Sequence, residues 1–529
     1  MMPLFSAQTP SPFPLFRRGR VVITSGSLFF QARYACLLLG LALLASLLYN
    51  PLLARVGAAP EYAFALLLSS LGLVLGVYLL HCLGKVGLVL APLFGLVLSL
   101  FTYITALYYL EPGPSFIGAM AETTGEEAGV YITFASVGTI LAGVAAYTGV
   151  VWQTRRFFSH LNVFILVFFG IHLLFAQSNN LTRHATKEMR HAAKWSMEYL
   201  TDPIKYALQY VNGEKGRVDT LRNLPSAAAF PASLRPQEPL TIVLVVGESL
   251  RADHLSMNGY ARSTTPLLAK ERLVNFPRTR STAAWTRESV IGIFTNRLPE
   301  QEQSSHGSFV SILQKLGFTV ATYSANTKPN RSDYSFAILT EGAKRFYSPR
   351  PDMIMVGQLQ QQLDAAQGFS LHILSPYGSH FGYRDGYPKE DAAFTPDDYN
   401  YPLSTSEIPT IINSYDNTVL YTDKVLSAAI DLLRSKNAVL IYVSDHGESL
   451  GEEGRFFHGQ NTAAEQRQVP FFLWFSESFR AANPAIIAAL EGHTKEQVHH
   501  SNLFHTLLGI AGISTPLRDP ARDLTQVQP

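Results

Sequence analysis

The sequence predicts a chain in two parts, an N-terminal domain of five transmembrane helices and a C-terminal α/β sandwich. Two observations predict this division. Apolar residues make up 47% of the 529 residues, and the long apolar segments all lie in the first third. After residue 239, short apolar strands alternate with helical patterns, which is typical of a sheet covered by helices. We therefore expect a transmembrane domain at residues 1–178, a bridging helix and linker at 179–238, and an outer domain at 239–529.

Five apolar segments in the first part each approach the roughly 20 residues needed to cross a bilayer. They are Tyr34–Leu53, Tyr62–Leu83, Val86–Leu110, Tyr131–Trp152 and Leu161–Gln177. A cleaved signal peptide is the alternative for the first segment, but four more apolar segments follow it. Basic residues lie before the first segment and between the fourth and fifth, among them Arg17, Arg18, Arg155 and Arg156. The positive-inside rule therefore places the N-terminus in the cytoplasm and the residues after about Asn179 outside.

Charge and cysteine content narrow the function classes. A net charge of +2 is too small to indicate nucleic-acid binding. The two cysteines, Cys36 and Cys82, both lie in apolar segments, so no disulfide is expected in the outer domain. At about 290 residues, this domain can bury a hydrophobic core without one.

The outer domain is expected to contain five buried strands with helices between them. The strands are Leu240–Val246, Thr319–Tyr323, Ser370–Leu374, Val439–Val443 and Phe471–Phe475, and the helices are Phe309–Leu316, Ile411–Arg434 and His500–Ala511. The first strand lacks apolar-polar alternation, which indicates a strand of a parallel sheet covered on both faces. Ligands of such sheets bind just beyond the carboxyl ends of the strands.

Metal-ligand residues follow two of these strands. Glu248 comes directly after the first strand and Gly247, and Asp445 and His446 come directly after the strand Val439–Val443. We expect these side chains to meet at one edge of the sheet. Carboxylate and imidazole ligands together favour zinc, with manganese as the less favoured metal. Taken alone, Glu248 has the alternative role of a helix cap.

Two further histidines stand in loops of the outer domain. His380 lies in the segment YGSHFG and His458 in the segment FFHGQ. Either can hold a second metal or contact a phosphate oxygen. Surface histidines without a function are the alternative.

A nucleophile is predicted at Thr286, in the segment STAAWTRESV. This threonine stands immediately before a helical pattern that runs to about Asn296, where the amide dipoles favour an anion. A threonine hydroxyl activated by a metal there can attack phosphorus. The alternative is a plain helix N-cap.

The loop between the third and fourth apolar segments carries a candidate headgroup contact. Thr123 and Glu127 are four residues apart, so they share one face of a short acidic helix. The carboxylate suits an ammonium group. The alternative is a solvated helix at the membrane interface.

The motifs GESLRADHLSMNGY, WTRESV, NSYDNTVLYTD and SDHGESLGEEGRFFHG resemble the envelope phosphoethanolamine transferases of Gram-negative bacteria. That family belongs to the alkaline-phosphatase and sulfatase superfamily and includes lipid A modifiers responsible for polymyxin resistance. The resemblance covers nearly the whole chain, five crossings included. It implies a multi-pass inner-membrane protein whose outer domain, of alkaline-phosphatase and sulfatase type, is a metal-dependent catalytic domain in the periplasm.

The resemblance also implies roles for individual residues. Zinc would be held at one certain site, with a second metal as an option, and Thr286 would form a covalent intermediate. The implied ligands are Glu248, Thr286, Asp445 and His446, and the implied substrate-binding residues are Thr123, Glu127, His380 and His458, of which the two histidines are also candidates for proton transfer. Phosphatidylethanolamine would be the donor. The acceptor would be lipopolysaccharide, at a core sugar or lipid A, or another envelope glycan.

Some positions depart from the family pattern. Ala119 stands where an asparagine is usual, the segment Asn326–Arg331 is a loose match, and the disulfides common in lipid A-modifying members are missing. The missing disulfides and Ala119 favour a core sugar or another envelope glycan over lipid A.

Three other functions are alternatives. A sulfatase would need a cysteine or serine at the nucleophile position, within a short maturation motif that contains proline and arginine, and the segment WTRES lacks this motif. A glycerophosphate transferase of the lipoteichoic-acid synthase type shares the fold and the threonine. A non-enzymatic headgroup sensor would need no nucleophile.

Overall fold

The structure is a computed structural model that describes residues 16–17, 20–21, 80, 83–108, 134–154, 219–297, 304–325, 333–365, 367–400, 403 and 405–527. The chain divides into two compact units. The first contains helices α3 and α6, and the second contains every described residue from Asp219 onward.

Two of the predicted crossings fall on described helices of the first unit. Helix α3 (Lys85–Tyr108) coincides with the third and helix α6 (Phe134–Thr154) with the fourth. The described parts of the chain contain no helix that is long and apolar enough to cross a membrane. The other three segments lie almost wholly outside the described residues, as do Ala119, Thr123 and Glu127.

The second unit is built on a seven-stranded sheet in the order β5-β14-β10-β4-β9-β7-β8. Its strands are β4 (Thr241–Gly247), β5 (Leu273–Asn275), β7 (Thr319–Ser324), β8 (Lys344–Tyr347), β9 (Ser370–Ser375), β10 (Ala438–Ser444) and β14 (Phe471–Phe475). The five predicted strands are all present within about a residue of the expected bounds. Shorter described strands are β1 (Phe16–Arg17), β2 (Arg20–Val21), β3 (Ser233–Leu234), β6 (Thr279–Arg280), β11 (Ser449–Leu450), β12 (Phe456–Phe457), β13 (Gln468–Val469), β15 (Val498–His499) and β16 (Ile513–Ser514).

The sheet is mixed, so the expectation of a parallel sheet is wrong at one edge. Strands β10, β4, β9, β7 and β8 run parallel to one another, whereas β14 runs antiparallel to β10 and β5 antiparallel to β14. All five residues of β14 are buried. A strand that is apolar on both faces carries no sequence signal for its direction.

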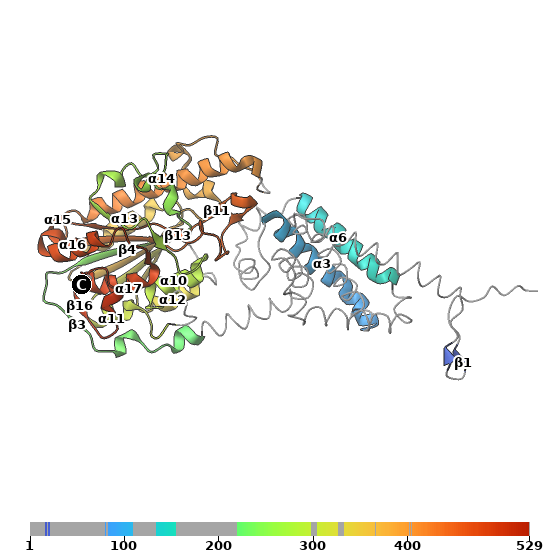
Figure 1. The fold of residues 1–529 in the computed structure, drawn as a ribbon, viewed down its shortest axis with the longest axis horizontal. Coiled ribbons are helices and arrows are strands. Elements are labelled where there is room, and N and C mark those ends of the chain that lie inside the picture. The colour runs from blue at the N-terminus through green and yellow to red at the C-terminus, as the bar shows by residue number, and fades with distance from the viewer. Residues whose placement is uncertain are drawn as a thin grey trace, which may run out of the picture. The chain divides into compact units, whose positions relative to one another are not determined.

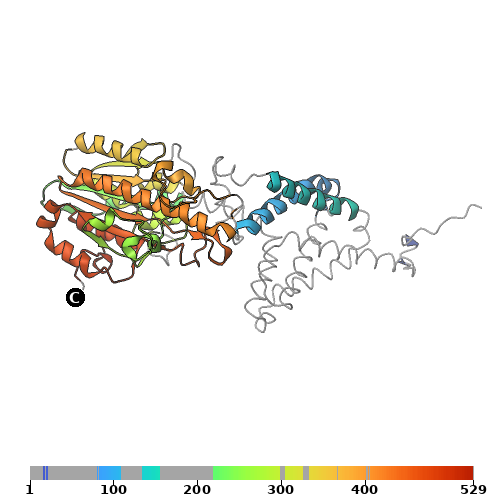
Figure 2. The same ribbon diagram turned by 90° about the horizontal axis from the view of Figure 1, so that it is seen from above.

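Helices cover both faces of the sheet (Figure 1). The described helices are α10 (Thr286–Phe294), α11 (Phe309–Lys315), α12 (Asp333–Leu339), α13 (Met353–Ala365), α14 (Ile408–Leu433), α15 (Glu477–Ala482), α16 (Pro484–Gly492) and α17 (His500–Ile510). Helices α13 and α14 lie on one face, and α10, α11, α12 and α17 on the other. Figure 2 shows the long helix α14, in orange, lying across the strands. This is the expected α/β arrangement.

The hydrophobic core lies largely between the sheet and the α10–α17 face. Ile242, Leu244 and Val246 of β4 belong to the same buried cluster as Ile291 of α10 and Phe504 of α17. Each such side chain contributes about 1.5–3 kcal/mol when fully buried. The core therefore holds β4 rigidly, and with it the residues that follow β4.

The described part of the segment expected as a linker belongs to the second unit. Leu221 and Ala227 are part of the buried core. Strand β3 pairs with β16, and the Arg235 amide donates to the Gly512 carbonyl over 2.9 Å. The residues from Asp219 to the start of β4 are thus built into the outer domain.

Candidate active site

The parallel strands β4 and β10 bring their following residues together. Gly247, the last residue of β4, is paired with Ser444, the last residue of β10. The Asp445 amide then donates to the Gly247 carbonyl over 2.9 Å. A Cβ at position 247 would lie 2.1 Å from the Tyr442 hydroxyl, so only glycine fits there. This register places Glu248 beside Asp445 and His446.

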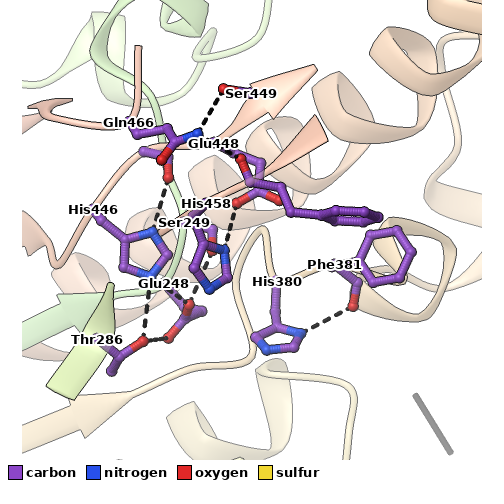
Figure 3. A network of polar contacts seen from close by, with 12 residues as sticks. Glu248, Ser249, Thr286, His380, Phe381, His446, Glu448, Ser449, His458 and Gln466 are labelled. Atoms are coloured by element: carbon purple, nitrogen blue, oxygen red, sulfur yellow. Dashed lines mark hydrogen bonds and ion pairs between the residues drawn. The ribbon is translucent and has the colours of Figure 1, made fainter. Parts of the chain in front are cut away.

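Thr286 joins the same cluster from helix α10. It is the first residue of the helix, and the N-cap is Trp285, which makes no side-chain cap. The Thr286 Oγ1 atom instead lies 3.3 Å from Glu248 Oε2 and 3.2 Å from His446 Nε2 (Figure 3). Its hydroxyl therefore faces the cluster of candidate ligands. Thr286 is not the N-cap residue of α10, which was the alternative role.

The distances from His446 Nε2 to the other three side chains match those between ligands of a tetrahedral zinc site. His446 Nε2 lies 3.3 Å from Glu248 Oε1, 3.4 Å from Asp445 Oδ2 and 3.2 Å from Thr286 Oγ1. Ligand bonds of about 2.0–2.1 Å in a tetrahedron separate the donor atoms by about 3.3 Å. Asp445 Oδ2 is buried and accepts no hydrogen bond. The donor set therefore fits a zinc ion, which would supply the missing partner of this oxygen.

His446 is held in the orientation that a metal ligand needs. Its Nδ1 atom lies 2.8 Å from the Gly447 carbonyl oxygen and donates its proton there. This hydrogen bond selects the tautomer with a lone pair on Nε2, the atom that faces the other three donors.

The electrostatics of the cluster also favour a cation. Burial, together with the charge of Glu248, raises the pKa of Asp445 to about 7. Burial lowers the pKa of His446, but the charges of Asp445 and Glu248 outweigh it and raise this pKa to about 10. For Glu248, burial is outweighed by the hydrogen bond and charge of His446, so its pKa falls below the ordinary value. The carboxylates of Glu248 and Asp445 therefore lie close together in a buried place, where a bound cation would compensate their negative charge.

A second cluster adjoins the first and contains a residue that sequence reasoning missed. His446, Glu448 and His458 each have a ligand atom within 4.8 Å of the others, and the ring centroids of His446 and His458 are 4.2 Å apart. Glu448 is fully buried, lies 2.8 Å from His458 Nδ1 through Oε2, and accepts from the Tyr383 hydroxyl over 3.1 Å. The sequence signal that could have identified Glu448 is its position two residues after His446, just beyond the end of a strand.

The loop that carries His458 is clamped by Gln466, which is fully buried. The Gln466 Nε2 atom donates to Ser449 Oγ over 2.8 Å and to the Phe457 carbonyl over 3.0 Å. Its Oε1 atom accepts from the Gln460 amide over 2.7 Å. One side chain thus fixes the backbone on both sides of His458 (Figure 3).

His380 lies in a loop that is tied to Glu248. The amide of the preceding residue, Ser379, donates to the Glu248 carbonyl over 3.1 Å. Asp352 accepts from the amides at the start of this loop, Tyr377 and Gly378, over 2.8 and 3.0 Å. The His380 Nδ1 atom is 2.9 Å from the Phe381 carbonyl oxygen. The structure therefore places His380 and His458 beside the cluster, while Asn326–Arg331 lies outside the described residues.

Comparison with known proteins identifies the family. Residues 240–513, more than half of the chain, match the Sulfatase family. The chain belongs to the sulfatase family. The predicted resemblance to its phosphoethanolamine transferase members is confirmed, because the chain is a homologue of these enzymes.

Individual relatives show how far this likeness extends. The phosphoethanolamine transferase EptA of Escherichia coli K12 is 33% identical over 306 residues, which cover 54% of this chain and 55% of the relative. The chain thus spans about half the length of the curated relatives it matches. The zinc complex of the C-terminal periplasmic domain of EcEptC from Escherichia coli is 25% identical with a TM-score of 0.50, covering 58% of this chain and 90% of that one.

The overall fold has a counterpart of nearly full length. The integral membrane protein lipooligosaccharide phosphoethanolamine transferase A from Neisseria meningitidis covers 92% of this chain and 98% of its own, with a TM-score of 0.75 and 24% identity. At this identity the likeness establishes the fold.

Proposed function

We propose that this sulfatase-family protein transfers phosphoethanolamine from phosphatidylethanolamine to an envelope acceptor through a covalent intermediate on Thr286. The observation that carries the proposal is the position of the Thr286 hydroxyl, within 3.3 Å of Glu248 and 3.2 Å of His446. Homology to phosphoethanolamine transferases supports the transferred group. The segment WTRES lacks a sulfatase maturation motif, which argues against sulfate ester hydrolysis.

The chain's own residues provide the metal site that this reaction needs. Glu248, Thr286, Asp445 and His446 would hold zinc, and the zinc complex of the EcEptC domain supports this choice of metal. When bound, zinc lowers the pKa of a ligating hydroxyl and withdraws charge from a phosphoryl oxygen. A second metal at Glu448 and His458 would need a further ligand, because His446 Nε2 belongs to the first site and its Nδ1 bonds the Gly447 carbonyl.

The proposed reaction consists of two displacements at phosphorus. The Thr286 oxygen attacks the phosphorus of phosphatidylethanolamine, and the bond from phosphorus to the diacylglycerol oxygen breaks. Diacylglycerol leaves with a proton, and phosphoethanolamine remains as an ester of Thr286. The acceptor hydroxyl then attacks the same phosphorus, loses its proton, and releases the Thr286 oxygen. Placement of Thr286 at the N-terminus of α10 favours the phosphate charge in both steps.

His458 and His380 are the proposed proton carriers. The buried Glu448 carboxylate holds His458 through Nδ1 at 2.8 Å, which directs its other ring nitrogen away from Glu448. Such carboxylate-oriented imidazoles act as general acids or bases near neutral pH. In the first step they would pass the proton of the Thr286 hydroxyl to the leaving diacylglycerol oxygen, and in the second the proton of the acceptor hydroxyl to the Thr286 oxygen.

We further propose a bacterial inner-membrane location, with the catalytic domain in the periplasm. Five apolar segments and the distribution of arginines support five crossings, and the fold likeness to an integral membrane transferase supports the same placement. Donor and acceptor would both be membrane-anchored, so reactants meet on a surface rather than in solution. Thr123 and Glu127 remain the proposed headgroup contacts of the membrane part.

For the acceptor we favour a core sugar of lipopolysaccharide, or another envelope glycan, over lipid A. The absence of cysteines beyond Cys82 and the alanine at position 119 support this preference. Mass spectrometry of lipopolysaccharide and periplasmic glucans, from cells with and without the protein, tests it. Phosphoethanolamine on the lipid A phosphates, with a rise in polymyxin tolerance that requires Thr286, would overturn the preference and leave the transferase assignment intact.

Trapping of the intermediate tests the reaction itself. Intact-protein mass spectrometry after incubation with phosphatidylethanolamine alone should show a phosphoethanolamine adduct that maps to Thr286. Thr286→Ala should lose both adduct and transfer. The matched control is Thr295→Ala at the other end of α10, a buried threonine bonded to the Ile291 carbonyl, which should keep both. A glycerophosphate adduct would indicate the lipoteichoic-acid type of reaction, and full transfer by Thr286→Ala would contradict the mechanism.

A further inference from the structure

Ser249, the residue after Glu248, has a backbone conformation that is rare for serine. Its φ is 57°, in the left-handed region that non-glycine residues seldom adopt. The residue is fully buried. Such conformations persist where the surrounding structure requires them, and they are concentrated at functional sites.

Each polar group of Ser249 is committed to the candidate metal site or to its support. The hydroxyl donates to Glu248 Oε1 over 2.9 Å, and the amide donates to Asp445 Oδ1 over 3.1 Å. The carbonyl accepts from the Tyr415 hydroxyl over 2.7 Å. Figure 3 shows Ser249 next to Glu248. The left-handed turn is therefore what lets one residue donate to both carboxylates.

These contacts orient the two carboxylates in the candidate metal site. Asp445 Oδ1 accepts from two amides, those of Ser249 and of His446, the latter over 2.7 Å. Asp445 Oδ2 accepts none. In Glu248, Oε1 takes the serine hydroxyl and also lies 3.3 Å from His446 Nε2, while Oε2 lies beside Thr286 Oγ1. Ser249 therefore helps to occupy one oxygen of Asp445 while the other accepts no hydrogen bond, and it fixes the orientation in which Glu248 faces His446 and Thr286.

The turn is anchored from outside by helix α14. The buried Tyr415 hydroxyl donates to the Ser249 carbonyl and accepts from the Arg251 amide over 2.9 Å. It thus holds both sides of the turn.

From these contacts we infer that Ser249 is a positioning residue, which fixes the Glu248 carboxylate through its hydroxyl and turns Asp445 Oδ2 toward the metal through its amide. The inference rests on the metal site proposed above. Outer hydrogen bonds of this kind orient ligands, and their removal typically weakens metal binding about 10–100-fold. Without the Ser249 hydroxyl, the Glu248 carboxylate can turn, so both the zinc affinity and the coordination geometry should change.

The test compares Ser249→Ala, Ser249→Gly and Ser370→Ala in the purified full-length protein. Ser370 is a buried serine at the start of β9, bonded to Thr241 Oγ1, and serves as the matched control. Both variants at 249 lose the hydroxyl, but only glycine relieves the left-handed strain. Zinc affinity is measured by chelator competition, and the coordination by the visible absorption of the cobalt(II)-substituted protein. Thermal melting without metal checks folding.

Both variants at 249 should bind zinc about 10–100-fold more weakly than the wild type, with altered cobalt absorption, and Ser370→Ala should match the wild type. Wild-type affinity and spectrum in Ser249→Ala would overturn the inference and leave the proposed function standing. A loss in the alanine variant that glycine restores would assign the effect to strain and would also overturn it. A wild-type protein that binds no zinc would refute the proposed function together with the inference.

Discussion

Replacing His505 by glutamine should reduce the acid sensitivity of the outer domain. His505 of α17 is fully buried, and its Nδ1 atom accepts from the Asp519 amide over 2.9 Å, which requires the unprotonated ring nitrogen. Burial, assisted by the charge of Arg522, lowers the pKa of His505 to about 3, against about 6.5 in an unfolded chain.

The sign and size of this effect on stability follow from proton linkage. A histidine with a depressed pKa in the folded state binds its proton only after unfolding, so its contribution to stability is present above pH 6.5 and is lost as the pH falls toward 3. Between pH 7 and pH 5, this one histidine should lower the free energy of unfolding by about 2 kcal/mol. Glutamine can still accept from the Asp519 amide but does not titrate. Between pH 7 and pH 5, the free energy of unfolding of His505→Gln should therefore fall by about 2 kcal/mol less than that of the wild type.

Urea unfolding of a fragment that starts at residue 208, followed by circular dichroism with a chelator present, measures this difference. His493→Gln is the control with the opposite sign. Burial lowers the pKa of His493, but hydrogen bonds to the Gln526 carbonyl and to Glu496 outweigh it and raise this pKa. His493 therefore stabilises the fold at low pH, and its replacement should increase acid sensitivity. Equal pH dependence in His505→Gln and wild type would refute the reasoning.

Two further predictions concern the site and the domain boundary. Gln466→Met removes the hydrogen bonds that fix the loop of His458, so kcat/KM should fall about 10–100-fold with a displaced pH profile; an unchanged profile would show that the clamp does not position this histidine. A fragment that starts at residue 235 lacks β3 and the buried side chains before it, so its free energy of unfolding should be about 2–5 kcal/mol lower than that of the fragment from residue 208. Equal urea midpoints for the two fragments would contradict the packing of the segment 219–234.

The regular elements could be predicted from the sequence because their signal is local. The apolar run at Leu240–Val246 identifies β4 and the edge of the sheet where Glu248 stands. The direction of β14 could not be predicted, since a strand with all five residues buried reads the same both ways. Helix α13 (Met353–Ala365) was missed because its second half, QLQQQLDA, is mostly polar and its apolar stripe is narrow.

Site prediction depended on a different kind of signal. Residues directly after buried strands, such as Asp445 and His446, could be predicted because strand ends of a parallel sheet converge. Ser249, Glu448 and Gln466 could not, because their roles depend on which carboxylate or backbone group lies opposite in space. A serine in GESLRAD has no pattern that marks it as left-handed, and a glutamine 20 residues beyond His446 has none that marks it as buried beside the site.

The arrangement of carboxylates links metal binding to folding. Asp445 and Glu448 are almost fully buried and Glu248 is 17% exposed, so three acidic groups surround His446 where water cannot solvate them well. Buried charge of one sign is unfavourable unless protons or a cation compensate it. The pKa of Asp445, raised to about 7, shows that this carboxylate tends to keep a proton. A divalent cation can replace such protons with a fixed charge, and a ligand present at 100 times its Kd adds about 2.7 kcal/mol to the free energy of unfolding. The same buried acids that would bind zinc for catalysis therefore make the metal-bound state the more stable fold.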